Sequence, residues 1–180
     1  MVTDYKMLFA GFGGQGILFV GKVAVNAGLC DGKEVSWLPS YGPEMRGGTA
    51  NCSVCIADEP IGSPLVTNPN VFVAMNQPSY EKFIDKVAPG GLVILDSTLI
   101  QADQVREDVK VVRMPATDMA EQNDLKGLAN IIILGKLFAE TGFCAEESLQ
   151  EGLKHCVPAS KQHLVAANQK AIELGRAFAE

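Results

Sequence analysis

The sequence has little charge of either sign. Charged residues make up 20% of its 180 residues, whereas soluble domains typically have about 25%. The formal net charge is −6, so the chain offers no basic field for a nucleic-acid backbone, and we expect no nucleic-acid partner. A chain with so few charges has little polar material to cover a free surface. The composition therefore favours a protein that buries part of its exterior in partners, although a large α/β core would give a similar bias.

Long apolar runs and targeting segments are also missing. No run of apolar residues approaches the ~20 that a membrane-spanning helix needs, so we expect no membrane partner. The N-terminal sequence MVTDYK leads directly into a strand-like segment and lacks the pattern of a signal peptide. We therefore expect a soluble, cytoplasmic protein whose thiols are reduced.

Cysteine and histidine are too scattered to predict a metal centre. Cys52 and Cys55 form a C-x-x-C, but they lie in a predicted strand, where residues three apart point to opposite faces. No second C-x-x-C or C-x-x-H completes a set of four ligands. We therefore expect no metal ligand in this chain. His155 and His163 have no evident cysteine or carboxylate partner and are expected to be solvated residues at helix ends.

Short apolar segments alternate with helical patterns along the chain. The strands that this pattern predicts comprise residues 7–11, 34–38, 49–58, 71–76, 91–96 and 110–114. The predicted helices comprise residues 15–28, 78–87, 126–140, 145–156 and 160–178. This alternation favours an α/β fold: a three-layer, Rossmann-like, mostly parallel sheet flanked by helices, with a helical C-terminal third. Without repeats or long linkers, residues 1–180 are expected to form a single domain.

Two of the predicted helices have faces that can be derived from residue spacing. Gly21, Ala24 and Gly28 form a stripe of small residues that can lie close on a sheet. In the last helix, apolar residues recur three and four positions apart and are expected to face the core. These residues are Leu164, Ala167, Ala171, Leu174 and Phe178.

A glycine-rich loop follows the first predicted strand. Gly11, Gly13 and Gly16 match G-x-G-x-x-G, in which the glycines permit a tight turn, close approach to a phosphate and close packing of helix on strand. Gly14 adds another small residue, and Gln15 places an amide at the mouth of the loop. The N–H groups at the start of the following helix can then face an anion.

The second predicted strand argues against a nicotinamide dinucleotide. Proteins that bind NAD place an acidic residue at the end of this strand to hold the ribose hydroxyls. Here the strand ends in Leu38-Pro39-Ser40, and Glu34 lies at its other end. The glycine loop is therefore either a purely structural turn or an anion site for another phosphate ligand.

The segment SYGPEMRGG, Ser40 to Gly48, is a predicted loop of unusual composition. Gly47 and Gly48 permit close approach of the backbone. The guanidinium of Arg46 is a planar fork of donors suited to a phosphate or a carboxylate. The alternative is a surface ion pair between Arg46 and Glu44.

The chain offers no complete set of catalytic residues. It contains no G-x-S-x-G, Walker or H-E-x-x-H motif. Asp96, at the end of a predicted strand, is expected to cap the segment that follows it. We therefore predict no catalytic residue in this chain.

The combination of these segments resembles the gamma subunit of 2-oxoacid:ferredoxin oxidoreductases. The resemblance is carried by GFGGQGILFVGKVAV, SYGPEMRGGTANCSVCIADEPIGSPLV, VFVAMNQPSYEKF and ILDSTLI, and later by ANIIILGKL and AANQKAIELG. It covers nearly the whole chain, and GGQG and SYGPEMRGG are its most specific parts. SYGPE-x-RGG is most similar to the 2-oxoglutarate enzymes, with branched-chain 2-oxoacid enzymes as the alternative.

The resemblance implies that the chain works with partner subunits. Thiamine diphosphate and iron–sulfur clusters would be bound by the alpha, beta and delta subunits, which would also receive ferredoxin. This chain would complete the thiamine and coenzyme A site and bind no cofactor alone. The candidate contacts for a shared coenzyme A are Gly11, Gly13, Gly14, Gln15, Gly16, Tyr41, Arg46, Gly47 and Gly48. The isolated chain is expected to be inactive and to self-associate as a homodimer through exposed apolar surface. The alternative is a stand-alone nucleotide-binding regulatory module.

Overall fold

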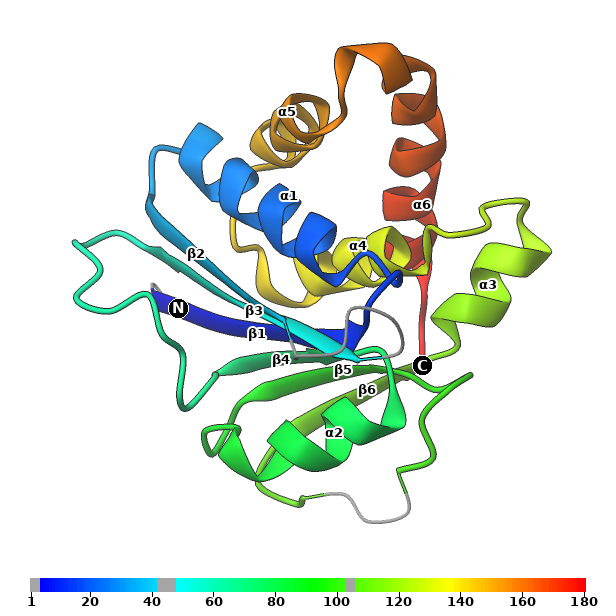
Figure 1. The fold of residues 1–180 in the computed structure, drawn as a ribbon. Coiled ribbons are helices and arrows are strands. Elements are labelled where there is room, and N and C mark those ends of the chain that lie inside the picture. Colours follow the sequence, from blue (N-terminus) through cyan, green and yellow to red (C-terminus); the bar gives the residue numbers. More distant parts are fainter. Residues whose placement is uncertain (1–3, 42–47, 103–105) are drawn as a thin grey trace.

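The computed structural model describes residues 4–41, 48–102 and 106–180, which fold around one six-stranded sheet with the strand order β2-β3-β1-β4-β5-β6 (Figure 1). The strands are β1 (Asp4–Phe12), β2 (Glu34–Tyr41), β3 (Thr49–Ala57), β4 (Val71–Ala74), β5 (Leu92–Asp96) and β6 (Lys110–Met114). β1, β4, β5 and β6 pair in parallel, whereas β3 runs antiparallel to both of its neighbours. The expected mostly parallel α/β fold is confirmed, with β3 as the exception.

The direction of β3 follows from the short connection before it. β2 ends at Tyr41 and β3 begins at Thr49, so the two strands form a hairpin. A parallel arrangement needs a crossover of a dozen or more residues, usually with a helix. Ser40 and Tyr41 therefore belong to β2, paired with Asn51 and Ala50, and not to the loop in which the sequence placed them.

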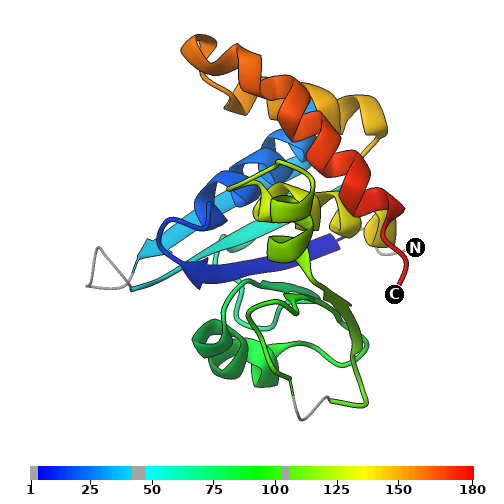
Figure 2. The same cartoon turned by 90° about the vertical axis from the view of Figure 1, so that its right-hand side faces the viewer.

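Helices cover both faces of the sheet. α1 (Ile17–Cys30), α4 (Ala129–Thr141), α5 (Glu146–Cys156) and α6 (Val165–Ala177) form a layer on one face, and α2 (Gln77–Phe83) lies on the other (Figures 1 and 2). The remaining helices are α3 (Ala116–Gln122), η1 (Ile84–Lys86) and η2 (Ala159–Leu164). The sequence pattern did not predict α3, because seven residues are too few to display a clear helical period. No helix in the described part of the chain has the length and apolar character needed to cross a bilayer.

α1 lies close on β3 because its inner face is made of small residues. A Cβ atom added at Gly21 would overlap the thiol of Cys52, and one at Gly28 would lie 3.0 Å from Ile56. Ala24 is fully buried between these positions. The small-residue stripe expected from the sequence is thus confirmed.

The outer helices also meet at glycines. In α4 and α6, a Cβ atom at Gly135 would overlap the carbonyl of Ile172, and one at Gly175 would overlap the carbonyl of Ile132. In α5, a Cβ atom at Gly152 would lie 2.5 Å from the backbone nitrogen of Ala27 in α1. These contacts bring the helix backbones together, so the helical layer has no room for side chains at these points.

The glycine contact also changes the buried face of α6. Its buried residues are Asn168, Ala171, Ile172 and Gly175. Of the stripe predicted from the sequence, Ala171 is fully buried, and Ala167, Leu174 and Phe178 pack at the edge of the core. Leu164 was expected in the core but is 41% exposed, because it is the last residue of η2 and α6 begins only after it.

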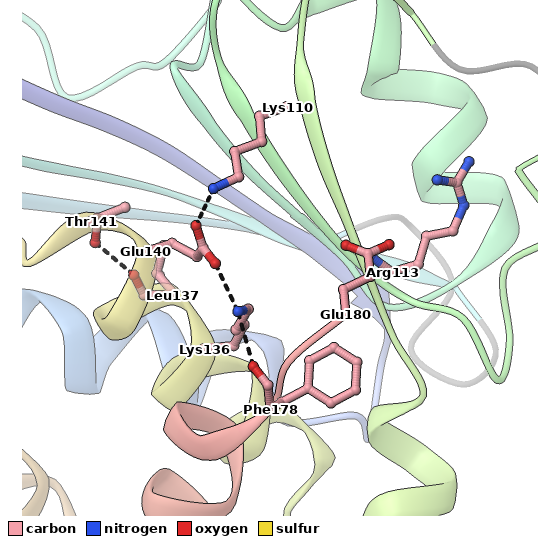
Figure 3. A network of polar contacts seen from close by, with 8 residues as sticks. All are labelled: Lys110, Arg113, Lys136, Leu137, Glu140, Thr141, Phe178 and Glu180. Carbon is pink, nitrogen blue, oxygen red and sulfur yellow. Dashed lines mark hydrogen bonds and ion pairs between the residues drawn. The ribbon is translucent and has the colours of Figure 1, made fainter.

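A buried lysine links the C-terminal residues to α4 and β6 (Figure 3). Lys136, which is 8% exposed, donates to the carbonyl of Phe178 at 3.1 Å and lies 2.7 Å from the carboxylate of Glu140. The second oxygen of Glu140 is 2.5 Å from Lys110 on β6. The hydrogen bond from Lys110, which has the larger effect, and the hydrogen bond from Lys136 lower the pKa of the Glu140 carboxyl below its ordinary value of 4.5.

Replacing Gly175 by alanine should destabilise the fold, although alanine is the better helix former. The added methyl group would meet the Ile132 carbonyl, and such overpacking typically costs about 1–3 kcal/mol. Gly62→Ala is the matched control, because its Cβ atom would meet nothing within 4 Å. Thermal melts should show a lower Tm for Gly175→Ala and an unchanged Tm for Gly62→Ala. Equal melting of Gly175→Ala and the wild type would contradict the close contact of α4 and α6.

Glu140→Gln should remove stability in a pH-dependent way. At pH 7 the loss of charged hydrogen bonds should cost about 1.5–3 kcal/mol. Because folding lowers the pKa of Glu140, this contribution is fully present above its ordinary value of 4.5 and disappears as the pH falls through the lowered, folded-state value. Urea unfolding of both proteins from pH 7 down to pH 3 should therefore give converging stabilities. The exposed Glu107→Gln is the control, and a gap that persists at the lowest pH would refute the prediction.

Candidate functional site

The glycine loop lies where the chain sends successive helices to opposite faces of the sheet. β1 and β4 are parallel neighbours, but the helix after β1 lies on one face and the helix after β4 on the other (Figure 1). In open α/β sheets, ligands bind at the carboxyl ends of the strands, in the crevice between two neighbouring strands whose helices lie on opposite faces. The loop between β1 and α1 is therefore in the position at which this fold usually places a ligand.

The backbone of the loop suits an anion. Gly14 and Gly16 have φ values of 98° and 72°, which only glycine adopts readily. Gly16 is the N-cap of α1, whose first turn has neither a side-chain cap nor an acidic residue. Gly13 and Gly14 are exposed. The positive end of the α1 dipole therefore lies near the surface, with no acidic residue in the first turn of the helix.

Gln15 holds the loop onto the neighbouring strand. Its Oε1 accepts a hydrogen bond from the backbone N–H of Phe12 at 2.6 Å, and its Nε2 donates to the carbonyl of Met75 at 2.8 Å. Gly11 makes room for this, because a Cβ atom there would lie 2.6 Å from Oε1. The amide that the sequence placed at the mouth of the loop is thus engaged within the chain.

Asn130, at the start of α4, supports the loop from the other side. Its Nδ2 donates to the carbonyl of Gly16 at 3.0 Å, and a Cβ atom at Gly16 would overlap this amide. Asn130 is 3% exposed, and its Oδ1 has no hydrogen-bond partner among the described residues. This contact joins residues 114 positions apart, so no local pattern in the sequence predicts it.

Gly48, the last residue of the predicted loop Ser40 to Gly48, contacts the glycine loop. The carbonyl of Gly48 accepts a hydrogen bond from the N–H of Gly13 at 3.1 Å. Tyr41 is 72% exposed at the end of β2. Arg46 and Gly47, two further predicted contacts, lie outside the described residues.

A hollow of about 390 Å³ opens beside the glycine loop. Its walls include Gly14, Met75 and Leu99 from the strand ends, and Thr117 and Lys126 from the α3 region. Larger hollows of about 530 and 660 Å³ lie elsewhere, the first of them around the amino ends of the parallel strands and the second beneath residues 58–68. We assign the candidate site to the smaller hollow, because ligands of such sheets bind at the carboxyl edge.

Asp96 organises the carboxyl edge without facing a ligand. It is completely buried, and its carboxylate accepts hydrogen bonds from the Thr98 N–H at 3.1 Å, the Thr117 N–H at 3.3 Å and the Thr117 hydroxyl at 2.5 Å. The expected capping role is confirmed, and it extends to the first turn of α3. Asp96 thus positions α3 at the wall of the hollow.

The two cysteines of the C-x-x-C motif point to opposite faces of β3. The thiol of Cys52 contacts the carbonyl of Ile17 at 3.6 Å beneath α1, whereas that of Cys55 contacts the carbonyl of Ser63 at 3.9 Å. Burial raises the pKa of Cys52 to about 12. The described residues contain no group of three or more histidine, cysteine or acidic side chains that could hold a metal ion.

The expectation that His155 has no partner was wrong. Its Nε2 lies 3.3 Å from the carboxylate of Glu151, and its Nδ1 lies 3.7 Å from the thiol of Cys30. The partner residue Cys30 is on α1 and 125 positions away, so sequence spacing gave no signal of this contact.

Exposed apolar side chains gather near the candidate site. Four of the large apolar residues that the described chain exposes lie toward the carboxyl ends of the strands or just after them: Phe12, Leu38, Tyr41 and Leu99. This distribution agrees with the expectation that the chain exposes apolar surface.

Known proteins share this sequence and fold. The chain is 39% identical over 178 residues to the ketoisovalerate oxidoreductase subunit VorA of Methanothermobacter thermautotrophicus, an alignment that covers 98% of this chain and 36% of VorA. It is 38% identical over 156 residues to the 2-oxoglutarate synthase subunit KorC of Methanocaldococcus jannaschii, which covers 85% of this chain and 83% of KorC. The chain thus spans about a third of the length of VorA but most of that of KorC.

A solved structure shows the same fold within a longer chain. It is the 2-oxoglutarate:ferredoxin oxidoreductase from Magnetococcus marinus with 2-oxoglutarate, coenzyme A and succinyl-CoA bound. The match has a TM-score of 0.88 and 26% sequence identity, and it covers 98% of this chain and 31% of that one. The family described as pyruvate ferredoxin/flavodoxin oxidoreductase matches residues 6–178. This match, over nearly the whole chain, confirms the resemblance found in the sequence, and the protein belongs to the pyruvate ferredoxin/flavodoxin oxidoreductase family.

Proposed function

We propose that this chain is the gamma subunit of a multi-subunit, thiamine-dependent 2-oxoacid:ferredoxin oxidoreductase of the cytoplasm. The observation that carries the proposal is the family match over residues 6–178 in a chain whose sequence contains no complete catalytic set. KorC, a relative of similar length, is itself named as a subunit. VorA, which contains a similar unit within a longer chain, supports the idea that this unit works beside others.

In the complete enzyme, the chain would close the thiamine and coenzyme A site. When bound, thiamine diphosphate supplies the decarboxylation of the 2-oxoacid, iron–sulfur clusters supply electron transfer to ferredoxin, and coenzyme A accepts the acyl group. We assign thiamine diphosphate, the clusters and the ferredoxin site to the alpha, beta and delta subunits. The apolar residues around Phe12 and Tyr41 would be covered by these partners.

The glycine loop would hold the diphosphate of coenzyme A. A dianion fits there because the first turn of α1 has no acidic residue and no side-chain cap, and because Gly14 is exposed. The wall of the adjoining hollow carries one charge of each sign, Lys126 and Glu121, so the backbone of the loop is the main source of attraction for an anion. Since Gln15 is engaged within the chain and the Gly13 N–H donates to Gly48, the backbone at Gly14 and Gly16 would provide the contacts.

We propose 2-oxoglutarate as the substrate of the complete enzyme. The segment Ser40 to Gly48 resembles that of the 2-oxoglutarate enzymes, and KorC is a 2-oxoglutarate synthase subunit of similar length. VorA is equally similar in identity and is a ketoisovalerate oxidoreductase subunit, so ketoisovalerate is the competing substrate. The part of the substrate pocket that selects between them would lie mainly on other chains.

The proposed function can be tested by recovering the native complex through an affinity tag on this chain. We expect co-purification of larger subunits that contain iron and thiamine diphosphate. The complex should reduce ferredoxin in the presence of coenzyme A and 2-oxoglutarate, and more slowly with ketoisovalerate, while the isolated chain should be inactive. Recovery of only a homodimer that binds a nucleotide, or turnover by the isolated chain, would exclude the subunit role.

The coenzyme A site can be tested by a charge pair at Gly14. Gly14→Asp and Gly14→Asn impose similar strain at a positive φ, and the structure has open space at this position. The aspartate should raise the KM for coenzyme A about tenfold relative to asparagine, which corresponds to about 1.4 kcal/mol, because its carboxylate would repel the diphosphate. Steady-state kinetics of the reassembled complex and melts of both variants are the measurements. Equal KM values for the two variants would mean that the loop is only a structural turn.

A further inference from the structure

Cys30 is exposed at the C-terminal end of α1, whereas the other cysteines are buried. Its thiol lies 3.7 Å from Nδ1 of His155 on α5. Nε2 of the same imidazole lies 3.3 Å from the carboxylate of Glu151, one turn earlier on α5. A thiol, an imidazole and a carboxylate are thus aligned across the contact between two helices, outside the candidate site.

Hydrogen bonds and a close backbone contact between the α1 and α5 regions fix this alignment. Just beyond Cys30, the carboxylate of Asp31 accepts hydrogen bonds from the Ala145 N–H at 3.0 Å and from the Ser148 hydroxyl at 2.9 Å. One turn later in α5, Gly152 lies directly on the backbone of Ala27. Ser148, Gly152 and His155 share one face of α5 by their four- and three-residue spacing. The position of His155 beside the thiol therefore follows from helix packing.

The order of these groups is that of an activated nucleophile. A nucleophile is activated when a base lies within reach of it and a third group orients that base. If Glu151 accepts the hydrogen bond from Nε2–H, the imidazole carries its lone pair on Nδ1, which faces the thiol. Nδ1 can then take the proton of Cys30 as the sulfur attacks an electrophile.

We propose that Cys30 is a modification site that reacts with low-molecular-weight disulfides. The sulfur of Cys30 forms a bond to one sulfur of the disulfide, and the disulfide bond breaks. The proton of Cys30 passes to Nδ1 of His155, and the second sulfur leaves as a thiolate that takes up this proton. The small disulfide is reduced to one free thiol, and Cys30 is oxidised to a mixed disulfide.

The remaining cysteines explain why the reaction would be selective. Burial raises the pKa of Cys52 and of Cys144 to about 12, and it also raises the pKa of Cys55 and of Cys156. The thiolate is the reacting form of cysteine, so these four thiols should react slowly in the folded protein. Cys30 combines exposure with a nearby base.

The test is the rate at which native, full-length protein releases thionitrobenzoate from dithiobis-nitrobenzoate at pH 7. We expect one fast thiol per chain, and Cys30→Ser should remove this fast phase. His155→Gln should slow the phase by about tenfold, which is less than the ~10²–10⁴ of a base in an enclosed active site. Glu151→Gln should slow it by a smaller factor. With glutathione disulfide as the probe, mass mapping should find a single adduct on the peptide that contains Cys30.

Matched variants separate activation from simple exposure. His163→Gln changes an exposed histidine in η2, whereas the thiol of Cys30 contacts His155, and should leave the rate unchanged. In denaturant, the wild type and the histidine variants should react alike, because the helix contact is gone. The inference is overturned if the fast phase persists in Cys30→Ser, or if His155→Gln reacts as fast as the wild type while melting at the same temperature.

Discussion

Contact between helix backbones is the constraint on which the outer layer of this molecule depends. Gly135 and Gly175 bring α4 and α6 together, and Gly152 brings α5 onto α1. Glycine permits this approach because any side chain would meet a carbonyl or amide of the opposite helix. The same packing has two consequences away from the glycines. Asn130 at the start of α4 donates a hydrogen bond to the carbonyl of Gly16, and His155 on α5 lies beside the thiol of Cys30.

The candidate site depends on how the chain leaves the sheet at its carboxyl edge. β1 and β4 send their helices to opposite faces, and the resulting crevice contains the start of α1. The hairpin of β2 and β3 then returns the chain to this point, where Gly48 meets Gly13. The glycine loop, the exposed Tyr41 and the hollow beside α3 therefore all lie at one edge of the sheet.

Several polar side chains of this chain stabilise the fold rather than face a ligand. At the carboxyl edge, Asp96 caps α3 and Gln15 joins the loop to the residue after β4. At the opposite edge, Glu140 pairs with Lys110 and Lys136. The carboxyl edge also exposes large hydrophobic side chains, among them Phe12, Tyr41 and Leu99. This arrangement is consistent with a protein whose surface is completed by other subunits.

The sequence alone determined the features that depend on neighbouring residues. Runs of buried apolar residues located the strands, the spacing of Gly21, Ala24 and Gly28 located the inner face of α1, and alternation along β3 separated the two thiols of its C-x-x-C. The family could be identified in the same way, because GGQG and SYGPEMRGG are continuous segments. Local geometry, which repeats every two residues in strands and every 3.6 residues in helices, is directly encoded in residue order.

Only the tertiary structure decided the features that join distant segments. Leu164 matched a helical period yet is exposed, because it lies in η2, before α6 begins. His155 contacts Glu151 and Cys30. The side chain of Gln15 donates a hydrogen bond to the carbonyl of Met75, 60 positions away. None of these outcomes follows from spacing along the chain, because they depend on which backbones approach closely enough to exclude a side chain, and that is settled only when the layers pack.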